Sequence, residues 1–348
     1  MATSTQYNPN RDLNERLLAV GASKTVYALV TPQIEAAKAT VFGDNESTQR
    51  EDYLDQFRDA WTAKQDAYHE EFFDTWHEWS KPVIDLDRAQ FPFYYPTAGA
   101  SEPIRQIIFD HKANGGTAIH VFKGEYEGYK AMAEAAGMQC IEHDRDGRDG
   151  WHTPFGGRLN RVASAIGRNH LFFISAPSAI DGNVWPDFNE FISKMPANKV
   201  VVDVTYVGAI GPGFEKFNMN QSAVRAVVFS LSKPFGAYYD RIGGVFMRKE
   251  DMGLFGNKWF KGLTGLRLGV RLMQFNDVFA MHRLYSDLQA VKAAEVANAL
   301  SMPLLPSDVF ILASGPTSDT YGEMGDYLGR GGKVRVCLTP GMTAEIRS

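Results

Sequence analysis

The chain has 348 residues and a formal net charge of −5 at pH 7, with 44% hydrophobic and 22% charged residues. This is the composition of a globular protein long enough for about two domains, and it excludes a chain that is disordered throughout. The acidic balance and the absence of a strongly basic domain argue against binding to nucleic acid. Its two cysteines, Cys140 and Cys337, cannot form a disulfide framework or a CxxC metal site.

The sequence contains no signal for a membrane or for export. Residues 1–18 lack an apolar run of signal-peptide length, and stretches such as 171–174 are far shorter than the roughly 18 residues of a membrane span. We therefore expect a cytoplasmic protein with no membrane partner. The eight histidines form no HxH or HExxH cluster, so no metal site is expected.

Residues 48–80 are predicted to form one or two helices that carry an aromatic stripe at a spacing near 3.6 residues. The stripe consists of Phe57, Trp61, Tyr68, Phe72, Trp76 and Trp79. The simpler interpretation is packing in the core or between subunits. The alternative is a wall that faces a substrate.

From about residue 93, short apolar runs alternate with amphipathic stretches. We expect helices at 104–111, 126–136, 159–166 and 188–195, and strands at 117–122, 138–142, 170–175, 199–203, 226–230 and 242–247. Strands that are apolar throughout and alternate with helices predict a mostly parallel sheet covered on both faces. Residues 257–302 are predicted to be mainly helical, and residues 308–340 suit a small α+β domain.

Polar residues end several of the predicted strands. Ligands of α/β sheets bind outside the carboxyl ends of the strands, so these residues are candidates for a site. Ser175 and Asp203 each end a strand, and Ser230 is followed closely by Lys233. A lone Asp203 would be explained by capping of a helix, and a lone Lys233 by an exposed surface position.

Taken together, three motifs carry a resemblance. Asp203-Val-Thr-Tyr206, Ser230-Leu-Ser-Lys233-Pro-Phe-Gly236 and Arg241-Ile-Gly243 resemble, in order and spacing, the fold-type I pyridoxal phosphate enzymes of the aspartate aminotransferase superfamily, class I/II. The resemblance covers about residues 95–340. It implies a mostly parallel, seven-stranded α/β sheet sandwiched by helices, with a small α+β domain formed by the two chain ends. The implied parts are an N-terminal helical segment (1–90) for the small domain and dimer interface, a large cofactor-binding domain (91–255), and a helical connection with the C-terminal small domain (256–348).

The resemblance also implies three catalytic residues. Lys233 matches the lysine that forms a Schiff base with pyridoxal phosphate, and such a lysine needs a depressed pKa. Asp203 matches the aspartate that pairs with the pyridine nitrogen and so makes the ring an electron sink. Tyr206 matches the tyrosine that hydrogen-bonds the phenolic oxygen of the cofactor.

Other residues are implied to hold the cofactor. Tyr126 resembles the aromatic residue that stacks on the pyridine ring, with Tyr129 as the alternative and otherwise a core residue. A phosphate group needs amide groups at a helix N-terminus, hydroxyls and a guanidinium. The matching residues are Gly99, Ala100, Ser101, Ser230 and Arg241; in isolation, residues 97–102 also read as a capping turn with Ser101 as the cap.

Two further positions concern the substrate and a departure from the family. Arg335 resembles the arginine that binds the α-carboxylate of an amino acid. The alternative is that Arg335 is a surface residue on an edge strand. The asparagine that contacts the phenolic oxygen falls on Ala179, or on Ser178 if the loop shifts by one residue. We assign Ser178 to cofactor binding. The missing asparagine and the short C-terminal part put plain transamination in doubt.

We therefore predict a pyridoxal phosphate-dependent aminotransferase that converts an α-amino acid to a keto acid. The first alternative is a lyase, decarboxylase or cyclase that acts on an unusual amino acid. The second is a binding protein that keeps the fold, which the intact set of residues disfavours. Superfamily members dimerise with shared active sites, and the aromatic stripe and residues 259–267 are candidates for that interface.

Overall fold

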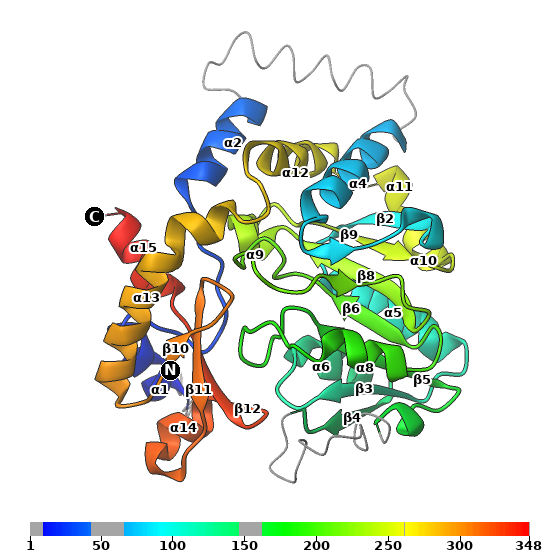
Figure 1. The fold of residues 1–348 in the computed structure, drawn as a ribbon. Helices are drawn as coiled ribbons and strands as arrows, with labels where there is room; N and C mark the ends of the chain where they lie inside the picture. The colour runs from blue at the N-terminus through cyan, green and yellow to red at the C-terminus, as the bar shows by residue number, and fades with distance from the viewer. Residues whose placement is uncertain (1–9, 43–65, 146–161, 261, 348) are drawn as a thin grey trace, which may run out of the picture.

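The computed structural model describes residues 10–42, 66–145, 162–260 and 262–347, and its centre is a seven-stranded sheet in the order β2-β9-β8-β6-β5-β3-β4 (Figure 1). In that order the strands are Phe93–Ala98, Ile242–Met247, Val224–Ser230, Val200–Asp203, His170–Ser175, Ala118–Phe122 and Gln139–His143. In this sheet β9 is antiparallel to both of its neighbours and the remaining pairs are parallel. The expected mostly parallel α/β sheet is therefore confirmed.

Helices cover both faces of this sheet. One face packs against α5 (Ser101–Ala113), α6 (Glu127–Ala135) and α10 (Met252–Phe255), and the other against α4 (Asp66–Ser80), α8 (Phe188–Lys194) and α12 (Leu263–Phe275). Successive strand residues point to opposite faces, so Val200 and Val202 join one core cluster and Val201 joins the other. A strand that is buried on both faces has to be apolar at nearly every position, as β6 and β8 are.

Three of the four described residues of the aromatic stripe pack inside the protein, and the fourth, Tyr68, is partly buried. Phe72 and Trp76 of α4 are buried, and the Trp76 ring stacks on Phe229 of β8 with 4.1 Å between centroids. Trp79 donates its indole N–H to the carbonyl of Asn276 at 2.8 Å. These residues therefore belong to the core of the monomer. Phe57 and Trp61 lie outside the described residues.

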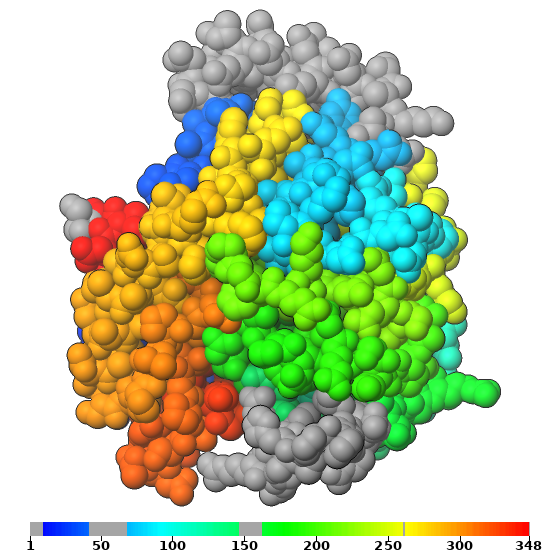
Figure 2. Space-filling view, in the orientation of Figure 1, coloured from blue at the N-terminus to red at the C-terminus, as the bar shows by residue number. Residues whose placement is uncertain are grey.

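A second, smaller unit is built on an antiparallel sheet in the order β10-β11-β13-β12. These strands are Leu305–Pro306, Leu312–Pro316, Lys333–Cys337 and Gly329–Arg330, and the accompanying helices are α13 (Ala280–Leu300), α14 (Gly322–Leu328) and α15 (Thr339–Arg347). The N-terminal helix α1 (Arg11–Ala19) leads into an isolated antiparallel bridge between Ser23 and Cys337. The described N-terminal segment and the C-terminal helix α15 therefore both lie against this unit (Figure 1), and Figure 2 shows the red C-terminal segment beside the orange part of the chain.

The remaining elements connect these two units. They are α2 (Pro32–Phe42), α9 (Ser232–Phe235), α11 (Asn257–Phe260) and the short parallel pair of β1 (Ile84–Asp85) with β7 (Phe217–Asn218). The strands expected at 170–175 and 242–247 match β5 and β9, whereas α5 begins three residues before the helix predicted at 104–111. Part of the helix expected at 159–166 lies outside the described residues. None of the helices in the described ranges is long and apolar enough to cross a membrane.

Candidate active site

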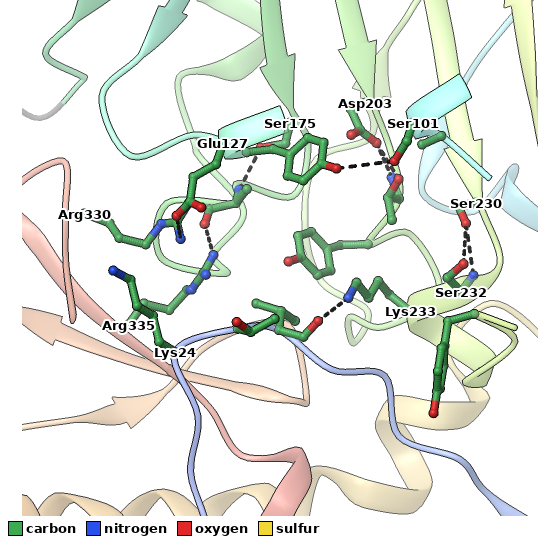
Figure 3. Close-up of a pocket in the computed structure, with 18 of the residues that line it drawn as sticks. Lys24, Ser101, Glu127, Ser175, Asp203, Ser230, Ser232, Lys233, Arg330 and Arg335 are labelled. Carbon is green, nitrogen blue, oxygen red and sulfur yellow. Dashed lines mark hydrogen bonds and ion pairs between the residues drawn. The ribbon is translucent and has the colours of Figure 1, made fainter. Parts of the chain in front are cut away.

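A cavity of about 510 Å³ lies at the carboxyl ends of the large-sheet strands, facing the small sheet (Figure 3). Ser175, Asp203 and Ser230 reach it from the ends of β5, β6 and β8, and Arg335 reaches it from β13. The segment at residues 24–26 lines the cavity from the N-terminal part of the chain. The site is thus assembled from both sheets and from both ends of the chain, at the strand edge where the sequence predicts it.

Lys233 lies on α9, directly after β8, and its side chain points into the cavity. Its Nζ donates a hydrogen bond to the carbonyl oxygen of Val26. Burial lowers the pKa of the Lys233 amine; the nearby Cys337 acts against this, and the positive charges of Arg335 and Arg241 add to the lowering. The amine is therefore more often neutral, and hence nucleophilic, than an exposed lysine.

Asp203 is buried at the end of β6, where three donors hold its carboxylate. The Thr205 backbone N–H donates to Oδ1 at 3.0 Å, the Thr205 hydroxyl donates to Oδ1 at 2.5 Å, and the Tyr129 hydroxyl donates to Oδ2 at 3.2 Å. Burial raises the pKa of Asp203, and these hydrogen bonds act against that rise. A cation placed against Asp203 would stabilise its ionised form.

Tyr126 and Tyr129 have different surroundings. Tyr126 is 39% exposed, lines the cavity and lies 3.3 Å from Ser101, hydroxyl to hydroxyl. Tyr129 is fully buried, with its ring packed near Phe173 and its hydroxyl on Asp203. Of the two tyrosines, Tyr126 is therefore the one that offers a ring face to the cavity. Tyr206 is also buried at the cavity wall, and burial raises its pKa.

One end of the cavity suits an anion. Ser230 Oγ lies 2.9 Å from Ser232 Oγ, and the Arg241 guanidinium donates to the carbonyl of Ala98 at 2.7 Å. Ala100 and Ser101 open helix α5 beside these groups. Hydroxyls, a guanidinium and a helix N-terminus together form a set of donors that matches a phosphate group.

Gly99 lies behind this anion-binding end rather than in the cavity lining. Its φ of +74° is a left-handed conformation that glycine adopts without strain. A Cβ at this position would lie 2.9 Å from Arg241 Nη2 and 3.4 Å from Ser230 Oγ. Only a glycine therefore allows Arg241 and Ser230 to approach the turn this closely.

Arg335 is 4% exposed at the opposite end of the cavity. One of its Nη atoms donates to the carbonyl of Ala179, and its Nε is buried without a partner in the described part of the chain. A buried donor without a partner is costly unless an acceptor binds there. An anionic group of a bound molecule would satisfy this guanidinium.

Ser178, which the family resemblance implies to hold the cofactor, is not among the residues that line the cavity. Ser178 is buried outside the cavity lining, and its hydroxyl accepts a hydrogen bond from Arg145 at 2.7 Å. Arg145 also pairs with Asp181 at 2.7 Å, which fixes the loop in this register. Ala179 lines the cavity instead, and its side chain has no hydrogen-bond donor.

Several residues of the cavity lining were not predicted from the sequence. Lys24, Thr205, Ser232 and Arg330 all line the cavity. Arg330 donates to the carbonyls of Gly124 at 3.0 Å and Glu125 at 2.9 Å, and burial and Arg335 lower its pKa to about 10. Ser232 and Thr205 stand inside motifs that had been singled out. Lys24 and Arg330 stand in no motif, and only the fold brings them to the site.

The fold and the cavity define a pyridoxal phosphate enzyme of fold type I. The residues fit that cofactor, since an amine of lowered pKa, a buried carboxylate and a phosphate-binding end share one cavity. The chain belongs to the family Aminotransferase class I and II, whose model matches residues 19–299. No curated protein matches the sequence.

Solved structures of low identity share the fold. An aminotransferase from Eubacterium rectale is similar with a TM-score of 0.62 and 14% identity, over 98% of this chain and 93% of that chain. Histidinol-phosphate aminotransferase from Clostridium acetobutylicum gives 0.59 and 12%, over 92% and 95%. A C-S lyase from Staphylococcus hominis with bound pyridoxal phosphate gives 0.59 and 10%, over 80% of each chain.

Proposed function

We propose that this protein transfers the amino group of an α-amino acid to a keto acid, with Lys233 as the residue that attaches pyridoxal phosphate. The observation that carries the proposal is the position of the Lys233 amine in one cavity, between a phosphate-binding end and the buried Arg335 guanidinium. The family and its aminotransferase neighbours support the same reaction.

Each residue has a task in this proposal. The phosphate is bound by Ser101, Ser230, Ser232 and Arg241, and the turn beside it is shaped by Gly99 and Ala100. Asp203 pairs with the pyridine nitrogen, and Tyr206 donates a hydrogen bond to the phenolic oxygen. Tyr126 covers the face of the pyridine ring. When bound, the cofactor withdraws electrons from the α-carbon of the amino acid. Arg335 then binds the α-carboxylate, which orients the α-hydrogen toward Lys233.

Lys233 also moves the proton. With the cofactor bound, Nζ would accept the proton from the α-carbon of the amino acid and would deliver it to the C4′ carbon of the cofactor, so Lys233 would act as both base and acid. Burial and the neighbouring cations, which lower the pKa of Lys233, keep Nζ able to accept this proton near neutral pH. The Tyr129 and Thr205 hydrogen bonds hold Asp203 in place throughout.

The test compares Lys233→Ala with the wild-type protein after reconstitution with pyridoxal phosphate. We expect the wild-type protein to acquire the visible absorbance of a lysine-attached cofactor and to convert amino acids, and the variant to lose both. Lys112→Ala removes an exposed lysine whose Nζ donates to Gly137, outside the cavity lining, and is the control. Retention of the absorbance and the activity by Lys233→Ala would refute the proposal.

A lyase is the second candidate, because Ala179 offers no hydrogen-bond donor where the family pattern places an asparagine. A structural neighbour of this chain is a C-S lyase. Incubation with amino acids in the absence of any keto acid separates the two reactions. An aminotransferase stops after one equivalent of product per site, whereas a lyase continues to turn over.

We also propose that the enzyme is a cytoplasmic homodimer in which residues 1–90 and the region around 259–267 contribute to the interface. The large domain would span residues 91–255, and the small domain would be completed by 256–348. Trp259 is 61% exposed in the monomer, which supports a partner on this side. Sedimentation should give a dimer at micromolar concentration, and Trp259→Asp should shift it toward monomer. A monomeric wild-type protein would contradict this proposal.

A further inference from the structure

Glu125 is a buried carboxylic acid directly behind the cavity wall, and the proposed reaction does not use it. It follows strand β3 and is 5% exposed. Its Oε2 accepts a hydrogen bond from the hydroxyl of Ser175, and its Oε1 accepts one from the Ser175 backbone N–H at 3.3 Å. Both hydrogen bonds come from one residue, and that residue is part of the cavity.

Ser175 connects Glu125 to the cavity. It ends β5, opposite Asp203 in the sheet, and it lines the cavity (Figure 3). Its Oγ also accepts the backbone N–H of Ala179 at 2.7 Å. A serine hydroxyl accepts up to two hydrogen bonds and donates one. While Glu125 is ionised, the single proton of the Ser175 hydroxyl is directed to Glu125 and away from the cavity.

Charged and titratable groups face this carboxyl from the surrounding elements. Arg145 lies after β4 and Asp203 on β6, Tyr129 lies on α6, and Arg330 of β12 donates to the Glu125 backbone carbonyl. Burial raises the pKa of Glu125 to about 7; the Ser175 hydrogen bonds and Arg145 act against this rise, and Asp203 adds to it. Both protonation states of Glu125 are therefore present near neutral pH.

We infer that Glu125 and Ser175 form a two-state hydrogen-bond donor of the cavity, in which protonation of Glu125 turns the Ser175 hydroxyl toward the bound molecule. In the protonated state the Glu125 O–H donates to Ser175 Oγ, which still accepts from Ala179. The Ser175 O–H then donates to an oxygen in the cavity. One proton is taken from solvent by Glu125, and no covalent bond of Ser175 changes.

This arrangement places a donor on the wall that Ala179 also lines without one. Glu125 is a positioning residue in this scheme, since it acts through Ser175. The inference rests on the proposed function in one respect: the oxygen that accepts the hydrogen bond from Ser175 belongs to the cofactor or to the amino acid. Glu125 also titrates in the cofactor-free protein, so its titration can be tested independently of the proposed function.

The first experiment follows the carbonyl stretch of protonated carboxyl groups by infrared difference spectroscopy on the cofactor-free protein. We expect a component with a midpoint near pH 7 that is absent in Glu125→Gln and retained in Glu127→Gln. Glu127 lines the same cavity but is exposed, so it is the matched control. Ser175→Ala should move the midpoint upward by about one pH unit, because the ionised form loses a donor.

The second experiment measures the visible absorbance of the protein reconstituted with pyridoxal phosphate between pH 5 and 9. The wild-type spectrum should change with a midpoint near that of Glu125. The amide introduced by Glu125→Gln would donate to Ser175 at every pH, so this variant should lose the transition, and Glu127→Gln should keep it. A wild-type protein that binds no pyridoxal phosphate would overturn the proposed function, and the infrared titration would still decide the state of Glu125.

Two results would overturn the inference. One is a carboxyl band near pH 7 that persists in Glu125→Gln. The other is a spectral transition of the bound cofactor that is the same in the wild-type protein and in Glu125→Gln. Should Glu125→Gln fail to fold, the upward shift in Ser175→Ala decides the question, and an unchanged midpoint in that variant would refute the pairing.

Discussion

At the scale of single residues, the turn at Gly99 links backbone geometry to ligand binding. Gly99→Ala would place a Cβ 2.9 Å from Arg241 Nη2, so the guanidinium has to move away from the anion-binding end. We expect the dissociation constant for pyridoxal phosphate to rise about tenfold, which corresponds to one lost hydrogen bond to a charged group. Titration of the cofactor-free protein, followed by absorbance, measures this constant.

Gly115→Ala is the matched control for this prediction. Gly115 has a similar φ of +83°, but a Cβ added there would meet no atom of the described residues within 4 Å. Both variants should lose about 1 kcal/mol of stability from strain in the left-handed region. Equal affinities of the two variants for the cofactor would show that the Gly99 turn does not hold Arg241.

The sequence was sufficient to predict the site residues whose positions are set by local structure. Asp203 and Ser230 end apolar strands, and strands of one parallel sheet bring their ends together. The sequence does not reveal that the Ser178 hydroxyl accepts a hydrogen bond from Arg145, because these two residues are 33 positions apart in the chain. The Tyr129–Asp203 and Glu125–Ser175 hydrogen bonds were missed for the same reason, since they join separate elements.

At the scale of elements, α4 supports the strand that leads to Lys233. Phe72 is fully buried, and its ring lies 5.9 Å from Phe229 of β8. We expect Phe72→Ala to reduce the free energy of unfolding by about 3–5 kcal/mol, the usual cost of a cavity of this size. Phe109→Ala, on a side chain that is 44% exposed, should cost less than about 1 kcal/mol.

Denaturant unfolding of the cofactor-free variants measures this difference. Similar losses in the two variants would mean that α4 is not part of the core of the large domain. The element pattern itself was largely predictable, because β5, β6 and β8 are rich in apolar residues and flanked by helical stretches. The sequence left open whether the aromatic face of α4 packs in the core, between subunits or beside a substrate, since periodicity does not reveal what an aromatic face contacts.

At the scale of the whole molecule, the site depends on the contact between two sheets. The large sheet and the turn after it supply Asp203, Ser230 and Lys233, and the small sheet supplies Arg330 and Arg335. The sequence predicted Arg335 through a family resemblance, but Arg330 stands between glycines without a motif. Arg330 reaches the cavity because the small sheet lies against the large sheet, and local sequence patterns do not predict this tertiary contact.

The bridge between Ser23 and Cys337 has a consequence for how the enzyme is made. The segment that carries Val26 to Lys233 is synthesised before the large sheet, and β13, whose Cys337 pairs with Ser23, is synthesised after it. A growing chain can therefore form the large sheet while Ser23 still lacks its partner on β13. The cavity is completed only after β12 and β13 have been synthesised, so a chain truncated between Lys233 and β12 lacks Arg330 and Arg335 in the cavity wall.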